Sequence, residues 1–340
     1  MNKLTFTTYA KENGGRVSLL FLLFLLAMYE LATSGLSVFA LICCLPLVVV
    51  VVVLTFKRTM GTFWTLIIVN FFIMWHGRPD IPVPASIPNE LLQILLLVLA
   101  IINVKDMKFG RCGNLMLVTL IIWTGFITLE VLNDTCGIGI DVASWYTTAR
   151  SLAYQLMYIF LVFSLYISNP KILTKYLFLW GALSLFAAFW VWKQQNIGFM
   201  EAEERWLMTR GRETHVLQAG TLIRYFSCYS DAANFGIGIA STAVAFLIFG
   251  ITSKIKKHKI FFLITGFACA WALFQSGTRT AIACLMAGFM AYVFLSKSFK
   301  IAVPVSIVFG IMAFLLIFTT IGNGNQQIRR MRSAFDKNDA

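Results

Sequence analysis

Two arginines stand at the start of apolar segments, where a fixed positive charge could bind an anion. Arg279 lies in SGTRTA between two apolar stretches, and Arg224 opens RYFSCYSDAANFG, which leads into another. A guanidinium offers planar, permanently charged, two-pronged hydrogen bonding to phosphate oxygens. Thr278 and Thr280 add hydroxyls, and the N-terminus of a following helix adds a partial positive charge. The pattern predicts an anion site; the alternative for Arg279 is an interfacial anchor.

Small residues recur at four-residue spacing in the apolar segments that follow both arginines. The stripes are Ala232, Gly236 and Ala240 in one segment, and Ala283, Ala287 and Ala291 in the other. Such stripes let two helix backbones approach closely. Our hypothesis is that Arg224 and Arg279 converge on one outer cavity if the two helices are neighbours.

Seven more candidate residues fall in two polar stretches. The first stretch holds Arg205, Arg210, Arg212 and His215, and the second holds Arg329, Arg330 and Arg332 in the sequence RRMR. Glutamates surround the first set, so much of it is expected to be a solvated, ion-paired face. The RRMR cluster either binds phosphate or anionic lipid headgroups or is simply solvated. His215 is in addition a candidate base.

The sequence indicates no metal, no cofactor and no nucleic-acid partner. Its three histidines show no metal-ligand spacing with one another. There is no P-loop, dinucleotide fingerprint or nucleophile elbow. The net charge of +13 lies in short connections between apolar segments, which favours a topology signal over nucleic-acid binding. A disulfide between Cys136 and Cys228 is possible.

Composition identifies the elements that must position these residues. Apolar residues make up 59% of the 340-residue chain and charged residues only 13%, whereas soluble domains are near half apolar and a quarter charged. The sequence therefore predicts an all-α, polytopic membrane helix bundle. Residues 1–16 are polar and no small-residue cleavage site follows the first apolar run, so we expect a retained first span.

Eleven transmembrane helices of about 20 residues each are predicted. They lie at 17–34, 36–56, 60–76, 89–104, 114–132, 148–168, 172–192, 233–252, 260–276, 280–296 and 301–321. The first two meet at residues 33–35 and could form one bent element, which would reverse the orientation of everything downstream.

Lysine and arginine divide between the two sides of this bundle. Thirteen of fifteen lysines fall on the side of the N-terminus, and ten of thirteen arginines fall on the other side. The positive-inside rule makes the lysine side cytoplasmic. The arginine candidates then lie at the outer face, where glutamates and aspartates leave the loops close to neutral overall.

The chain divides into four predicted regions. They are N-terminal transmembrane helices (1–192), an outer amphipathic loop (193–232), C-terminal transmembrane helices (233–321) and the start of a second outer loop (322–340) that looks incomplete. The first loop mixes charge with Phe199, Trp206, Leu207 and Met208, as expected of a helix lying on the membrane interface.

The second half of the chain resembles the O-antigen ligase / O-antigen polymerase superfamily of bacterial inner-membrane glycosyltransferases. SGTRTAIACLMAGFMAYVF is similar to a family motif in which a Ser-Arg pair opens a small-residue helix, although a threonine precedes Arg279 here. IRYFSCYSDAANFGIGIA keeps the arginine, aromatic residues and Asn234 of a second motif but lacks its proline. RRMRSAFDKNDA looks like the beginning of the family's large periplasmic loop. The resemblance covers residues 170–340.

This resemblance implies a metal-independent glycosyl transfer at the periplasmic face, in surface polysaccharide assembly. The donor would be an undecaprenyl-diphosphate-linked glycan, and a glycan or lipid hydroxyl would accept it. Arg224 and Arg279 would bind the diphosphate and stabilise the leaving group. The family also uses a histidine later in its large loop, for which His215 or a carboxylate could substitute here. Ligase and polymerase use the same donor chemistry, and the oligomeric state stays open.

Two other classes of function remain. Buried charges within the spans, together with broken helices, would favour a transporter or flippase of an anionic lipid-linked sugar. A non-catalytic membrane scaffold in a polysaccharide assembly complex is the third possibility.

Overall fold

The structure is a computed structural model. It describes residues 59–77, 86–133, 142–217 and 222–296, together with short stretches within 14–29 and 303–330. The chain forms two units, Met1–Trp64 and Thr65–Ala340. The first contributes the beginning of helix α4 (Thr59–Phe72), and all sites described below belong to the second.

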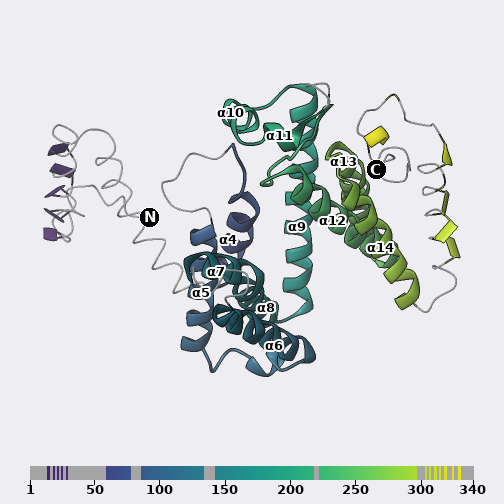
Figure 1. The fold of residues 1–340 in the computed structure, drawn as a ribbon. Helices are drawn as coiled ribbons and strands as arrows, with labels where there is room; N and C mark the ends of the chain where they lie inside the picture. Colours follow the sequence, from purple (N-terminus) through teal and green to yellow (C-terminus); the bar gives the residue numbers. More distant parts are fainter. Residues whose placement is uncertain are drawn as a thin grey trace, which may run out of the picture. The chain divides into compact units, whose positions relative to one another are not determined.

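The described residues form an all-α fold with one minimal hairpin (Figure 1). After α4 come α5 (Ser86–Ile102), the 3₁₀ turn η1 (Phe109–Cys112), α6 (Leu115–Leu129) and η2 (Glu130–Leu132). Next are α7 (Val142–Ala149), the π-helical segment η3 (Arg150–Tyr154), α8 (Gln155–Tyr166) and α9 (Pro170–Asn196). The short elements α10 (Glu201–Thr209), α11 (Arg212–His215), β1 (Val216–Leu217) and β2 (Leu222–Ile223) follow. The helices α12 (Ala232–Thr252), α13 (Lys256–Gln275) and α14 (Arg279–Ser296) complete the set.

Six described helical segments are long and apolar enough to cross a membrane. They are Leu115–Leu132, Val142–Tyr166, Pro170–Asn196, Ala232–Thr252, Lys256–Gln275 and Arg279–Ser296. Helices α4 and α5 are apolar but shorter. Eight predicted spans, from 60–76 through 280–296, therefore correspond to helices, whereas 17–34, 36–56 and 301–321 lie largely outside the described residues. This set makes the chain a multi-pass helical membrane protein.

One helix begins earlier than hydropathy predicts. Its predicted start is residue 148, but the helix starts at Val142. The added turns contain Thr147 and Thr148, whose hydroxyls donate to the carbonyls of Ala143 and Ser144, at 2.9 and 3.1 Å. Because these side chains bond to the preceding turn, polar residues continue the helix at little cost in a region that a hydropathy window excludes.

Asparagine and aspartate side chains fix the starts of two long helices, α9 and α12. Asn169 accepts from the backbone N–H of Ile172 at 2.9 Å, and Pro170 occupies the first turn of α9. Asp231 accepts from the N–H groups of Ala233 and Asn234, both at 2.8 Å, at the start of α12. These caps satisfy donors that have no partner within the helix.

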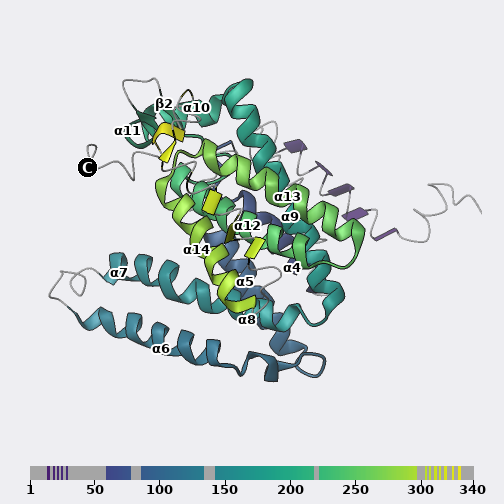
Figure 2. The same cartoon turned by 90° about the vertical axis from the view of Figure 1, so that its right-hand side faces the viewer.

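Helix α12 packs against α13, α14 and α9, and the largest described core lies among these helices (Figures 1 and 2). Its stripe of Ala232, Gly236 and Ala240 is buried, as close packing requires. The predicted stripe on α14 is not in this interface, because Ala283, Ala287 and Ala291 are exposed. Gly288 makes the approach instead: a Cβ there would lie 2.9 Å from a methyl group of Val244.

Gly236 gives a direct test of this packing. A Cβ at this position would lie 2.6 Å from Ser276 Oγ and 3.0 Å from Thr278 Cβ. We expect Gly236→Ala to lower the free energy of unfolding by about 1–3 kcal/mol, because neither contact can yield without moving the turn. Gly125→Ala in α6 is the matched control, since nothing lies within 4 Å of that position. Equal thermal midpoints for the two variants in detergent would contradict the packing.

Candidate functional site

Arg224 is held between the hairpin and the end of α13. The strands β1 and β2 pair antiparallel, with Val216 opposite Ile223, so the chain leaves β2 directly into Arg224. The backbone N–H of Arg224 donates to the carbonyl of His215 at 2.9 Å, and that of Tyr225 donates to Gln275 at 3.2 Å. The backbone of Arg224 is thus fixed on both sides before its side chain makes any contact.

The turn between α13 and α14 is the second half of the site. Ser276 Oγ donates to the carbonyl of Leu273 at 2.8 Å and accepts from the N–H of Thr278 at 3.2 Å. Gly277 between them has φ +58°, a left-handed conformation that glycine adopts without a steric penalty. The turn therefore reverses the chain in three residues, and α14 begins at Arg279.

The guanidinium of Arg224 joins the two halves. Its Nε donates to the carbonyl of Ser276 at 3.2 Å, and its Nη2 donates to Thr278 Oγ1 at 2.9 Å. Its Nη1 donates to the carbonyl of Thr214 at 2.9 Å. A guanidinium has five N–H donors, and the other two have no acceptor within the described part of the chain. They remain available to an anion.

Three arginines gather at this turn. Arg330 lies within electrostatic range of Arg224 and Arg279; burial and then these two charges lower its pKa. The side chains of Arg224 and Arg330 both pack on Gly277, 3.5 and 3.7 Å from where a Cβ would stand. Burial also lowers the pKa of Arg224, which the nearby Asp231 partly offsets. Like charges held together in this way favour binding of an anion.

One carboxylate lies close to these cations. Asp231 Oδ1 accepts the two backbone N–H groups at the start of α12. Its Oδ2 accepts from Ser230 Oγ at 3.0 Å and from the amide of Asn234 at 2.6 Å. All four hydrogen bonds to Asp231 come from neutral donors at the helix cap, which stabilise its negative charge.

The other predicted arginines are exposed or lie outside the described residues. Arg205 forms an exposed ion pair with Glu201 at 2.9 Å on α10, as expected of a solvated face. Arg210 and Arg212 are exposed, and so is Arg329 beside Arg330. Arg332 lies outside the described residues. Arg330 is therefore the member of the RRMR cluster that the structure places against Arg224.

The two predicted threonines occupy different environments. Thr278 is buried; its hydroxyl accepts from Arg224 and donates to the carbonyl of Ala232 at 2.9 Å, so it connects the guanidinium to α12. Thr280 is exposed in the first turn of α14, next to the exposed Arg279. Thr278 therefore positions Arg224, whereas Thr280 and Arg279 face outward where a ligand could reach them.

His215 is not positioned as a base. It is 2% exposed. Its Nε2 accepts the backbone N–H of Ala232 at 3.0 Å, and its Nδ1 lies 3.1 Å from the carbonyl of Gly211 and 2.7 Å from Thr214 Oγ1. Both ring nitrogens are occupied in this conformation, so the imidazole joins α11 to the start of α12 and is closed to a substrate.

A buried carboxylate that sequence reasoning missed supports the whole region. Glu203 is fully buried, and its Oε1 accepts from the indole N–H groups of Trp75 and Trp190, at 2.9 and 2.7 Å, and from Gln194 at 3.1 Å. Its Oε2 accepts the N–H of Met200 at 3.0 Å. Four neutral donors satisfy the charge. The residue before α10 is Met200, whereas a serine or threonine usually marks the start of a helix that has a glutamate at its third position. The sequence pattern therefore did not indicate the role of Glu203.

Gln194 transmits this support to the segment that carries Arg224. Its Oε1 accepts the N–H of Ser227 at 3.0 Å, and its Nε2 is 3.4 Å from the Ser227 carbonyl. Ser227 has φ +52°, and its hydroxyl donates to the carbonyl of Ala187 at 2.7 Å. An unfavourable backbone conformation three residues after Arg224 is thus fixed by contacts from α9.

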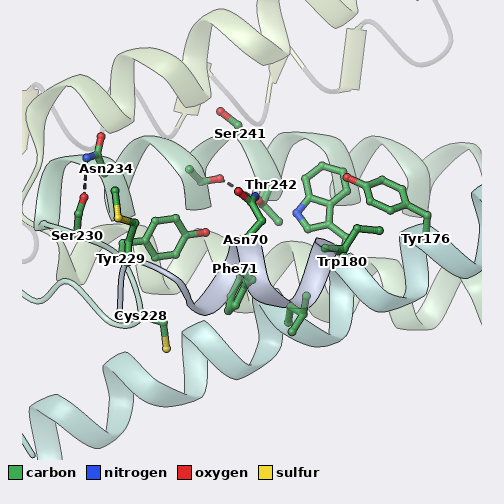
Figure 3. A pocket seen from close by; sticks show the side chains of 14 residues that line it. Asn70, Phe71, Tyr176, Trp180, Cys228, Tyr229, Ser230, Asn234, Ser241 and Thr242 are labelled. Carbon is green, nitrogen blue, oxygen red and sulfur yellow. Dashed lines mark hydrogen bonds between the residues drawn. The ribbon is translucent and has the colours of Figure 1, made fainter. Parts of the chain in front are cut away.

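A pocket of about 520 Å³ lies on another face of α12 (Figure 3). Its walls come from α4, α9, the turn at residues 228–230 and α12. None of its fourteen lining residues is Asp, Glu, Lys, Arg or His. On α12, Asn234 and Gly238 face the pocket, whereas Gly236 faces the turn before Arg279. One face of α12 therefore packs against the turn that carries the arginine cluster, and another face lines an uncharged pocket.

These elements define the protein's class as a multi-pass helical membrane protein with an arginine cluster at a turn between two long apolar helices. Comparisons with protein-family models, with curated proteins and with solved structures find no match.

The buried imidazole predicts a pH dependence of stability. Burial, followed by the charge of Arg224, lowers the pKa of His215 from its ordinary value of 6.5. The unfolded chain then binds this proton more readily than the folded protein, so stability falls as the pH drops below that value. We expect the thermal midpoint to fall between pH about 7.5 and about 5.5.

The variant His215→Gln isolates this contribution, because an amide oxygen can still accept the Ala232 N–H but does not titrate. Its thermal midpoint should change less between the two pH values than that of the wild type. His258→Gln, at a different histidine on α13, is the control and should retain the wild-type difference. An unchanged difference in His215→Gln would refute the assignment.

Proposed function

We propose that the chain is a membrane glycosyltransferase of the O-antigen ligase/polymerase type. It would transfer an undecaprenyl-diphosphate-linked glycan to an acceptor hydroxyl at the periplasmic face of a bacterial inner membrane. The observation that carries this proposal is the bonding of Arg224 to Ser276 and Thr278, in the turn from which Arg279 opens α14. The two sequence segments that resemble the family are thereby joined at one site.

The arginine cluster suits the chemistry of this reaction. Breaking the bond between the sugar and the diphosphate leaves negative charge on the phosphate oxygens, and preorganised cations stabilise it most in the transition state. Arg224 is oriented by three bonds and retains two free N–H donors toward the phosphates. Arg279 and Arg330 would add charge from two further directions. The acceptor's proton is not assigned, because both nitrogens of His215 are occupied.

The proposed topology is a bundle of about eleven spans with a cytoplasmic N-terminus and outer loops. Its support is the separation of charges along individual helices. Helix α9 carries Lys171 and Lys175 in its first turns and a single Lys193 in its last turn, beside the Glu203 network. Helix α12 ends at Thr252, two residues before Lys254. In both helices the lysine-rich end is opposite the end nearest the arginine cluster, which agrees with the positive-inside rule for an outer site.

Charge-conserving substitutions test the diphosphate site. Arg224→Lys keeps the positive charge but cannot make the three directed bonds, so we expect roughly a 10²- to 10³-fold loss of glycan transfer from an undecaprenyl-diphosphate donor. Arg279→Lys should lose less, because the Arg279 side chain is exposed, whereas that of Arg224 is partly buried in the turn. Transfer is measured with purified full-length protein in liposomes.

Arg205→Lys is the matched control, since Arg205 makes only an exposed pair with Glu201. It should retain wild-type transfer. Wild-type transfer by Arg224→Lys or Arg279→Ala, with normal amounts of folded protein in the membrane, would refute the diphosphate assignment.

The length distribution of glycan from cells that lack this protein separates polymerase from ligase. Loss of long glycan chains indicates a polymerase, and unattached long glycan chains indicate a ligase.

A transporter or flippase of an anionic lipid-linked sugar is the second candidate, and one observation favours it. Arg150 Nε lies 3.5 Å from Glu90 Oε2, with side-chain exposures of 19% and 13%, within two apolar helices. Arg150 opens the π-helical segment η3, an interruption of regular helix inside the Val142–Tyr166 span. Charges and interrupted helices at membrane depth are typical of transport pathways.

Removing one partner of this pair separates the two candidates. If the pair belongs to a transport pathway, Glu90→Gln should stop transbilayer movement of a lipid-linked sugar in liposomes, because it removes the carboxylate that pairs with the half-buried Arg150. Under the transferase proposal, transfer with donor and acceptor both outside should persist in Glu90→Gln and be lost in Arg224→Lys. If Glu90→Gln loses transbilayer movement and Arg224→Lys retains it, the result favours the transporter over the transferase.

A further inference from the structure

The pocket beside α12 has a hydrogen-bonding pattern that the arginine site does not use. Trp180 on α9 directs its indole N–H into the pocket, and the hydroxyl of Tyr229 points in from the opposite end (Figure 3). Neither group has a protein hydrogen-bond partner within the described residues. Asn70 from α4 adds an amide whose oxygen accepts from Asn89 at 2.9 Å and whose nitrogen is a donor. The lining hydroxyls of Ser241 and Thr242 already donate to the carbonyls of Ile237 and Gly238. Trp180, Tyr229 and Asn70 therefore offer the donors that a ligand in the pocket could use.

Tyr229 is built into this position. Its ring packs over Gly238, where a Cβ would lie 2.9 Å from Tyr229 Cε1 and 3.4 Å from its hydroxyl. The ring also meets Phe71 and Phe235 edge-on, at centroid distances of 6.0 and 5.4 Å. Burial raises its pKa, so the phenol stays protonated. Packing on three sides thus holds a hydroxyl in the pocket about six residues, or roughly 9 Å, below the start of α12.

These features restrict the ligand. The walls are mostly apolar, and no lining Asp, Glu, Lys, Arg or His could balance a charge, so the part of the ligand inside is uncharged and largely hydrocarbon. It also needs acceptor oxygens for Trp180 and Tyr229, because donors buried without partners cost free energy. A pure isoprenoid chain has no acceptor atom. The carbonyl of an ester-linked acyl chain has one and is attached to hydrocarbon.

We propose that this pocket binds a diacyl membrane lipid, with its ester carbonyls accepting hydrogen bonds from Trp180 and Tyr229 and an acyl chain lying along Phe71 and Leu183. The site is separate from the arginine cluster, which lies on the face of α12 marked by Gly236. The proposal does not depend on the transferase reaction. It would make a bulk membrane lipid a structural ligand that packs between α4, α9 and α12.

Two lipids that differ only in their linkage test the proposal. Full-length protein is freed of lipid in detergent and titrated with diester or diether phosphatidylglycerol of equal chain length, and bound lipid is counted by native mass spectrometry. The wild type should bind the diester form roughly two- to tenfold more tightly, the value of one net hydrogen bond. Binding of the shared headgroup to arginines contributes equally to both lipids, so failure of the diphosphate proposal would not alter this ratio.

Variants that each remove one donor test whether Trp180 and Tyr229 cause the preference for the diester lipid. Trp180→Phe and Tyr229→Phe each keep a ring and remove a donor, and together they should bring the diester-to-diether ratio close to one. Trp192→Phe, a 43% exposed tryptophan on the same helix, is the control and should keep the wild-type ratio. Equal wild-type affinity for both lipids, or a preference that survives the double variant, would overturn the proposal. So would equally strong competition by undecaprenol, which would identify an isoprenoid occupant.

Discussion

The contact between Arg224 and the turn before α14 is the interaction on which the arrangement of the arginine cluster depends. Arg224 and the turn before Arg279 are about fifty residues apart in sequence, so they can act on one ligand only if the two segments are joined, and the Arg224 guanidinium joins them. Gly277 lets the turn adopt its left-handed conformation, and Gly236 lets α12 approach it. Thr278 continues the connection to the first turn of α12. The Arg224 side chain therefore holds the site together and also offers its remaining donors to the candidate anion.

That contact is precise because a second, buried network fixes the backbone on its other side. Glu203 accepts from two tryptophans, a glutamine and a backbone N–H, and Gln194 extends the network to Ser227. A buried carboxylate without a cation is unusual, since burial of a charge is costly unless hydrogen bonds replace its hydration. Here the donors come from the turn after α4, from α9 and from the residue before α10. The cost of burying the charge is offset only when these three segments are assembled together.

The sequence predicts the helices well and the site in part, and the reasons are physical. Hydropathy locates spans because each must present apolar surface over its full length, and it fails at Val142 because hydroxyls bonded to the previous turn are invisible to it. The convergence of Arg224 with the turn before Arg279 follows from charge at two helix starts. The burial of His215 and Glu203 does not, since it depends on contacts across long sequence separations. The α14 stripe was misassigned because small-residue spacing alone does not say which face of a helix meets its neighbour.

Helix α12 separates two chemical environments, and its sequence shows how. Gly236 belongs to the face that meets the turn carrying the arginine cluster, and Gly238, only two residues later, belongs to the face under Tyr229. Because successive residues turn by about 100° along a helix, two glycines two positions apart point in nearly opposite directions. Each permits a close approach that a larger residue would prevent: a polar turn on one side and an aromatic ring on the other. An anion and an uncharged chain could therefore bind beside different faces of α12 without meeting, which separates electrostatic recognition from contact with the lipid phase.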